Sequence, residues 1–101
     1  MVANDAWRAV HRWDKFDAWS VGIQLVRAAD SVGANIAEAY GRYGLRDQRH
    51  LLYVARGSAY ETEHWTAVAL ARGLLADDAL EHRITELLKT LNGLIRAHRD
   101  Q

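Results

Sequence analysis

Proline and cysteine are both absent from the sequence. Without proline, no residue forces a helix to stop or kink, and the abundance of Ala, Leu, Arg and Glu favours long uninterrupted helices. Without cysteine, disulfides, thiolate metal sites and cysteine nucleophiles are excluded. The sequence therefore predicts an all-α protein whose fold depends on the packing of helices against one another.

An excess charge of either sign is also missing, because 13 Lys and Arg side chains balance 13 Asp and Glu side chains. General binders of nucleic acid or of anionic membranes depend on excess positive charge, so neutrality weighs against both. No stretch approaches the length of about 18 apolar residues that a membrane span needs. The first 13 residues are too polar for a secretion signal. We therefore expect a cytoplasmic protein without a membrane contact.

What the sequence does contain is helical periodicity in four segments. The chain length suits one domain, covering residues 1–101. In the second segment the apolar residues recur at spacings of three and four, as one face of a helix requires. We predict helices at about 4–13, 17–43, 47–75 and 78–98.

Several residues predict where these helices begin and end. Asp14 and Asp17 could each cap the second helix. The segment 41–44 holds two glycines and ends that helix, because glycine readily takes the left-handed cap conformation. Asp78 stands three residues before Glu81, which is a capping-box arrangement for the start of the fourth helix.

The predicted third helix is apolar in nearly every direction around its axis. Such a helix is normally buried all round, and this chain has too few other helices to cover it. Gly33 and Gly57 lie inside helices, where glycine costs about 1 kcal/mol relative to alanine, and we interpret both as close backbone contacts with a neighbouring helix. The sequence therefore predicts a second, intermolecular interface and a homo-oligomer.

The second helix also carries a polar stripe at spacings of three and four. Its members are Gln24, Arg27, Ser31, Asn35, Glu38 and Arg42. One interpretation is a solvent-facing edge. The other is an inter-helix polar network, in which burial of Arg27 and Glu38 would require that both be paired. We assign helix-helix or subunit contacts to Arg27, Ser31, Asn35 and Glu38.

Parts of this pattern resemble a known family. The matching segments are Gln24, 27–29, 31–42, 53–62 and 91–95. Together and in this order they resemble the signature of the four-helix-bundle proteins named after the rRNA intervening-sequence protein. Two features depart from the family pattern: Ala39 stands where glycine is usual, and the first helix is much shorter.

The resemblance implies an antiparallel up-down four-helix bundle, here with a shortened first helix. Characterised members assemble as homopentameric barrels, so it also implies a homo-oligomer, with a pentamer expected. Founding members are encoded within insertions in ribosomal RNA genes. A relative, the accessory protein of diversity-generating retroelements, binds a reverse transcriptase and nucleic acid through a strongly basic surface. Most members have no known activity. We therefore predict a non-enzymatic scaffold or adaptor of unknown precise role, which has other copies of itself, and a possible further protein, as partners.

A nucleic-acid-binding accessory protein is the alternative function. Arginines and tyrosines are interleaved around the junction of the second and third helices, and they could pair with phosphates and stack on bases. The candidate contacts are Arg42, Tyr43, Arg46, Arg49 and Arg56. The same residues also suit a solvated helix connection, which the zero net charge favours.

A remote alternative is a metal-dependent enzyme. Glu61 and His64 form one Glu-x-x-His pair, which is half of the motif of di-iron bundles. A complete site needs a second pair, and the chain has none. No serine or threonine has a partnered base at a recognisable spacing. We therefore expect no metal, no cofactor and no catalytic residue.

Overall fold

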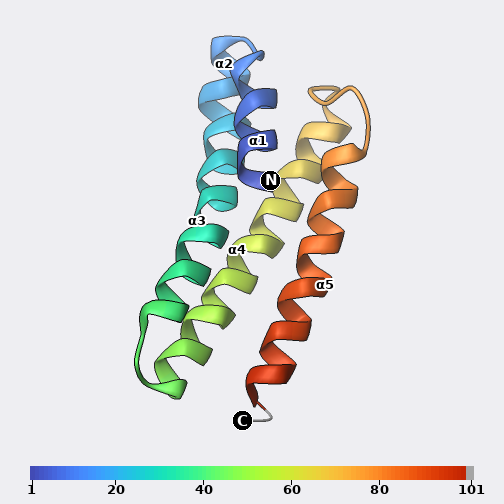
Figure 1. The fold of residues 1–101 in the computed structure, drawn as a ribbon. Coiled ribbons are helices and arrows are strands. Elements are labelled where there is room, and N and C mark those ends of the chain that lie inside the picture. Colours follow the sequence, from blue (N-terminus) through green and yellow to red (C-terminus); the bar gives the residue numbers. More distant parts are fainter. Residues whose placement is uncertain (100–101) are drawn as a thin grey trace.

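The structure is a computed structural model that describes residues 1–99, and within this range it is entirely helical, without strands. Its elements are α1 (Val2–His11), α2 (Lys15–Asp17), the π-helical turn η1 (Ala18–Gly22), α3 (Ile23–Gly41), α4 (Leu45–Ala71) and α5 (Ala79–Arg99). Because α2, η1 and α3 follow one another without a break, they form one continuous rod. The chain thus makes an antiparallel bundle of four rods, 46 Å long (Figure 1).

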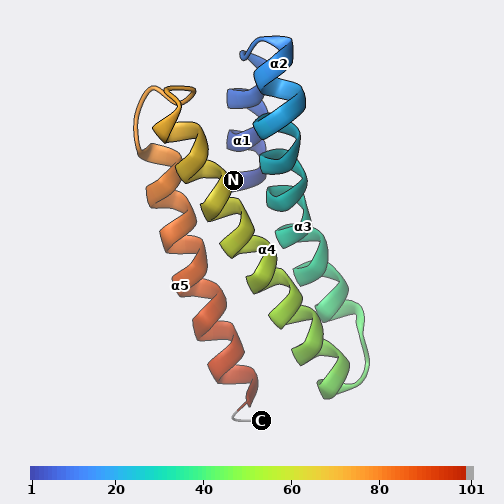
Figure 2. The ribbon, with the colours of Figure 1, turned by 180° about the vertical axis from the view of Figure 1, so that it is seen from behind.

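The first rod is much shorter than the others. α1 and α4 both pack against α3 and α5, so they occupy opposite corners of the bundle. α1 spans only the half of the bundle nearest the α4–α5 connection, and the N-terminus lies about midway along the molecule (Figures 1 and 2). The shortened first helix predicted from the sequence is therefore present, and the other half of its corner is left open.

The hydrophobic core follows this asymmetry. Most buried apolar residues, among them Val10, Leu25 and Ile84, form one cluster that includes the inner side of α1. At the opposite end, a second cluster contains only Ala39, Leu52 and Ile95 as buried members. The core is therefore smallest where α1 is missing.

The rod made of α2, η1 and α3 begins as the sequence predicted and ends differently. Asp14 is the cap, and its carboxylate accepts a hydrogen bond of 2.9 Å from the backbone N–H of Asp17. The rod ends at Gly41 without a left-handed glycine. Arg42 and Gly44 are both extended, with φ of −86° and −84°. The proposed glycine mechanism was therefore wrong at this connection.

Left-handed glycine instead ends α4, four residues before the predicted position. Gly73 has a φ of +73° and is the only residue between 1 and 99 with a positive value. Its N–H donates to the carbonyl of Leu70 at 3.1 Å, and the N–H of Leu74 donates to the carbonyl of Ala69 at 2.9 Å. These two bonds form a Schellman motif, which satisfies the last carbonyls of the helix. The sequence interpretation missed it by treating the apolar residues 74 and 75 as helical.

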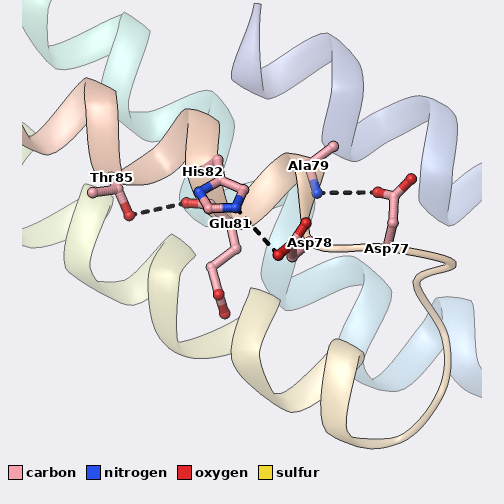
Figure 3. Close-up of polar contacts among 6 residues, drawn as sticks. All are labelled: Asp77, Asp78, Ala79, Glu81, His82 and Thr85. Carbon is pink, nitrogen blue, oxygen red and sulfur yellow. Dashed lines mark hydrogen bonds and ion pairs between the residues drawn. The ribbon is translucent and has the colours of Figure 1, made fainter.

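The start of α5 also differs from the prediction. Figure 3 shows that the carboxylate of Asp77, rather than that of Asp78, accepts a backbone N–H at the start of the helix, from Ala79 to its Oδ1 at 3.0 Å. The carboxylate of Asp78 lies 3.2 Å from Nε2 of His82. Glu81 contributes only its backbone carbonyl, which accepts from Thr85. The predicted capping box is therefore replaced by two separate carboxylate contacts.

A tight contact holds α1 against η1. A Cβ atom at Gly22 would lie 2.5 Å from Cγ1 of Val10 and 3.3 Å from the carbonyl oxygen of Asp17. Side chains do not tolerate carbon–carbon separations this short, so only glycine permits this approach. Gly22 therefore sets how closely α1 packs on the bundle.

We expect Gly22→Ala to lower the free energy of unfolding by about 1–3 kcal/mol, the usual effect of overpacking. Urea denaturation followed by circular dichroism measures it. Val10→Ala removes the clashing methyl group, so the double variant should lose less than the sum of the two single variants. Gly93→Ala is the control, because no atom lies within 4 Å of a Cβ at that position. Equal destabilisation by the two glycine substitutions would contradict the steric explanation.

Candidate functional site

The middle of the polar stripe lies at the seam between α3 and α4. Oγ of Ser31 is 2.9 Å from Oγ of Ser58 across the two helices. Nδ2 of Asn35 donates to both the carbonyl oxygen and Oγ of Ser31, at 2.8 and 3.0 Å. Thr62, fully buried, donates to the carbonyl of Ser58 at 2.7 Å. Ser31 and Asn35 are thus placed in a hydrogen-bonded contact between helices of one chain.

The outer members of the stripe face solvent. Arg27 and Glu38 are both exposed, and within residues 1–99 Arg27 forms no ion pair. Glu38 pairs with Arg42, one helical turn further along, instead of with a buried partner. The hydrogen bond and the negative charge of Glu38 raise the pKa of Arg42, so that guanidinium remains cationic. Within this chain, the stripe is an exposed edge with a polar helix contact at its centre.

The outer face of α4 is one helix face that the rest of residues 1–99 leaves uncovered. We use this name for its exposed residues between 53 and 60, which are Tyr53, Val54, Gly57 and Tyr60. Tyr53 and Val54 are each 37% exposed and Tyr60 is 49% exposed. No atom of the chain lies within 4 Å of a Cβ built at Gly57. The helix that looks apolar all round is therefore buried on one side only.

Gly33 on α3 has the same character as Gly57. It is exposed, and a Cβ there would also meet no atom within 4 Å. The close helix contacts that we predicted for both glycines are absent within the chain. Neither glycine is explained by packing inside a single copy.

Positive charge is concentrated at one end of the bundle, where α3 ends, α4 begins and α5 ends (Figure 1). The segments 34–60 and 90–99 contain six arginines and only two carboxylates, Glu38 and Asp47. We call this region the basic end. Elsewhere in residues 1–99, ten carboxylates outnumber seven Lys and Arg. The zero net charge therefore conceals a separation of charge along the long axis.

The residues predicted to contact nucleic acid all lie at the basic end, but they differ in exposure and in their hydrogen-bond partners. Arg46 and Tyr43 are fully accessible, and Tyr43 is 103% exposed. Arg49 is half-buried, with an Nε that has no hydrogen-bond partner. Arg56 donates to Oδ1 of Asn92 at 3.1 Å and lies 5.0 Å from the ring centre of Tyr53. Arg42, paired with Glu38, completes the set.

Sequence reasoning missed two arginines of this end. Arg96 and Arg99 are near the C-terminus of α5, far from the others in sequence, and antiparallel packing brings α5 alongside the first half of α4. The relevant signal is the absence of any acidic residue between 90 and 99. It becomes meaningful only when the direction of α5 relative to α4 is known.

A partly buried pair of hydrogen bonds through Gln48 ties the basic end together, and no sequence pattern indicated it. Nε2 of Gln48 donates to the carbonyl of Arg42 at 2.7 Å, so its Oε1 faces Nε2 of His98 at 3.1 Å. His98 is only 8% exposed. Gln48 therefore joins the α3–α4 connection to the last turn of α5.

Glu61 and His64 do not point into the core. Both are exposed on α4, and the His64 ring lies edge-on to Trp65 at 4.9 Å. In di-iron bundles the corresponding pairs project inward. Across residues 1–99 no three His, Asp or Glu side chains are grouped so that they could hold a metal ion. In the same range, no helix has both the length and the apolar character needed to cross a membrane.

The Ser31–Ser58 contact can be tested with a double-mutant cycle. Ser31→Ala and Ser58→Ala should each lower the free energy of unfolding, with a coupling energy of about 0.5–1.5 kcal/mol, the usual net contribution of a hydrogen bond. Urea denaturation of both single variants and the double variant measures it. Ser20→Ala is a control for the loss of a serine on the same rod, since Ser20 bonds only to carbonyls of its own rod. Additive losses would refute the contact.

Comparison with known proteins agrees with this architecture. None of the curated proteins matches the sequence. A solved structure does match: the crystal structure of a protein of unknown function from the S23 ribosomal protein family of Bacteroides thetaiotaomicron. It is 26% identical, with a TM-score of 0.75 over 94% of this chain and 98% of that chain. The model of the 23S rRNA-intervening sequence protein family matches residues 1–95. The chain therefore belongs to the 23S rRNA-intervening sequence protein family.

Proposed function

We propose that the protein is a non-enzymatic, cytoplasmic scaffold or adaptor that acts as a homo-oligomer. The observation that carries this proposal is the uncovered outer face of α4. Tyrosines are typical anchors of protein interfaces, because they bury a large area with little loss of side-chain freedom. Full burial of a large apolar side chain contributes about 1.5–3 kcal/mol. Tyr53 and Tyr60 could therefore supply a substantial part of an association energy.

Gly57 supports the same proposal. A glycine inside an exposed stretch of helix costs about 1 kcal/mol relative to alanine, and this chain gives it no compensating contact. A second helix that approaches closely at Gly57 would supply one. The family resemblance, which implies rings of five copies, agrees with an assembly through such a contact.

An adaptor also needs a surface for its partner. Two large aromatic side chains are exposed near the end opposite the basic end, Phe16 at 81% and Trp19 at 71%. Exposed aromatic residues of this size are enriched in protein interfaces. Repetition of such a surface in an oligomer would strengthen partner binding through avidity. We therefore place the partner contact near Phe16 and Trp19.

The assembly is tested by measuring the solution mass with light scattering at micromolar concentration. We expect a multiple of the chain mass of 11.4 kDa, with five copies implied by the family. Tyr60→Glu should shift the mass to that of one chain, because an unpaired charge would be buried in the contact. Tyr60→Phe keeps the apolar ring and should retain the assembly. A wild-type mass of one chain would refute the proposal.

A second candidate function is nucleic-acid binding, and the basic end is the observation that favours it. Six arginines outnumber two carboxylates there, and Tyr43 is fully exposed beside them. Arginines bind phosphates, and exposed tyrosines stack on unpaired bases. At 0.1 M salt, charges more than about 10 Å from a phosphate are largely screened. The charge near the binding surface therefore matters more than the net charge of the chain.

Binding of labelled structured RNA and duplex DNA across a salt series tests the second candidate. If the basic end binds phosphates, affinity should fall steeply as salt rises. Replacement of Arg46 and Arg49 with glutamate should then abolish binding and leave the helical content unchanged. Replacement of both Arg12 and Arg72 with glutamate is the matched control, because both arginines are exposed and lie outside the basic end. An absence of binding even at low salt would rule out this function.

A further inference from the structure

A groove between α3 and α5 begins beside the first residues of α1 and lies in the part of the bundle corner that α1 does not cover. Its volume is ≈ 360 Å³, and residues 1–3 close one end of it. Its walls include Ala29, Val32, Gly33 and Ile36 of α3, and Leu87 and Thr90 of α5. Apart from Arg83 and Glu86, every side chain in the walls is uncharged. Those two charges are already paired, Arg83 with Asp5 at 2.9 Å and Glu86 with Lys89 at 3.4 Å.

The apolar seam continues beyond this groove toward the basic end. A second hollow of ≈ 140 Å³ lies further along the same two helices, between Ala39 and Tyr40 of α3 and Leu94 and Ala97 of α5. Leu52 and Gln48 of α4 and His98 of α5 complete its lining, so this hollow is apolar with two polar side chains at its edge. The two hollows together follow the part of the fourth bundle corner that α1 leaves open. The shape and chemistry of this seam therefore fit the uncharged face of a helix.

The chain itself displays one helix face with the required chemistry. Between 53 and 60 the exposed residues of α4 are all uncharged, because Arg56 is turned toward Asn92. α4 also occupies the corner opposite the groove, so one copy could offer its α4 and accept another α4 at the same time. An exposed glycine falls on each of these two surfaces, Gly33 in the groove and Gly57 on α4. Glycines on both sides would let the backbones approach closely.

We propose that the outer face of α4 of one copy docks in the α3–α5 groove of the next copy. Each copy then completes the half-open corner of its neighbour with a helix. This inference rests on the proposed homo-oligomer and names the two surfaces that meet. It also gives Gly33 and Gly57 a neighbouring helix, which neither glycine has within the chain.

The symmetry of the proposed contact separates it from a simple dimer. The two surfaces differ, one convex and one concave, so the contact is heterologous and leaves a free surface at each end of a pair. A ring with an odd number of copies can be built only from contacts of this kind. Direct contact between two α4 helices would instead be two-fold and would end at a dimer.

Engineered disulfides test the pairing, because the chain has no cysteine of its own. Gly57→Cys places a thiol on α4, and Thr90→Cys places one in the groove wall. A disulfide requires Cα atoms about 4.4–6.8 Å apart, so it forms only where the surfaces meet closely. Mixing the two purified single variants under oxidation should give a covalent dimer on a non-reducing gel. Gly33→Cys with Gly57→Cys is a second pair. It tests the same contact if Thr90→Cys lies too far from Gly57→Cys to form a disulfide.

The matched control is Thr85→Cys mixed with Gly57→Cys. Thr85 is an exposed threonine on α5 that does not line the groove, so this mixture should stay monomeric on the gel. A double variant with Gly57→Cys and Thr90→Cys should give a ladder or a closed ring of covalent copies. Circular dichroism before oxidation shows that each variant is folded.

Light scattering on the same samples separates the two proposals. A multimeric mass with no cross-link between either groove cysteine and Gly57→Cys would overturn the docking inference and leave the oligomeric scaffold standing. Cross-linking of Gly57→Cys to itself alone would also overturn it, in favour of a two-fold contact between α4 helices. A mass of one chain would overturn both proposals.

Discussion

The structure depends on one constraint: each apolar helix face must pack against another element, because exposure of apolar surface to water costs free energy. Three long rods cover one another along their length, and α1 covers only half of the seam between α3 and α5. The core is correspondingly small at the end without α1. Within residues 1–99, the open groove and the outer face of α4 are two of the surfaces where this constraint is not met.

At each end of the bundle, one specific contact helps to fix how the helices pack. Near α1, Gly22 lets Val10 approach the π-helical turn more closely than any side chain would allow. At the other end, where few apolar residues are buried, Gln48 joins the α3–α4 connection to His98 of α5 through hydrogen bonds. A buried polar link of this kind fixes the geometry of helix ends that apolar packing alone leaves less defined.

The sequence predicted the helices better than the site, for physical reasons. Apolar periodicity is a local property, so the four rods followed directly from it. Residue type left both Asp14 and Asp17 as candidate caps, and the structure selects Asp14. The end of α4 was misplaced because Leu74 and Leu75 continue the apolar pattern after Gly73 has already turned the chain. The basic end depends on the antiparallel pairing of α5 with α4, which joins Arg56 to Asn92 and Gln48 to His98. Periodicity carries no information on such pairings.

The two candidate functions are compatible in one assembly. In a cyclic ring all copies point the same way along the symmetry axis, so every basic end would lie on the same rim. A patch of six arginines and two carboxylates would bind phosphates only weakly when alone, because salt screens most of its attraction. Repetition around a rim converts weak single contacts into avidity for a polyanion. Oligomerisation would therefore let a chain of zero net charge bind nucleic acid while a lone copy of it binds poorly.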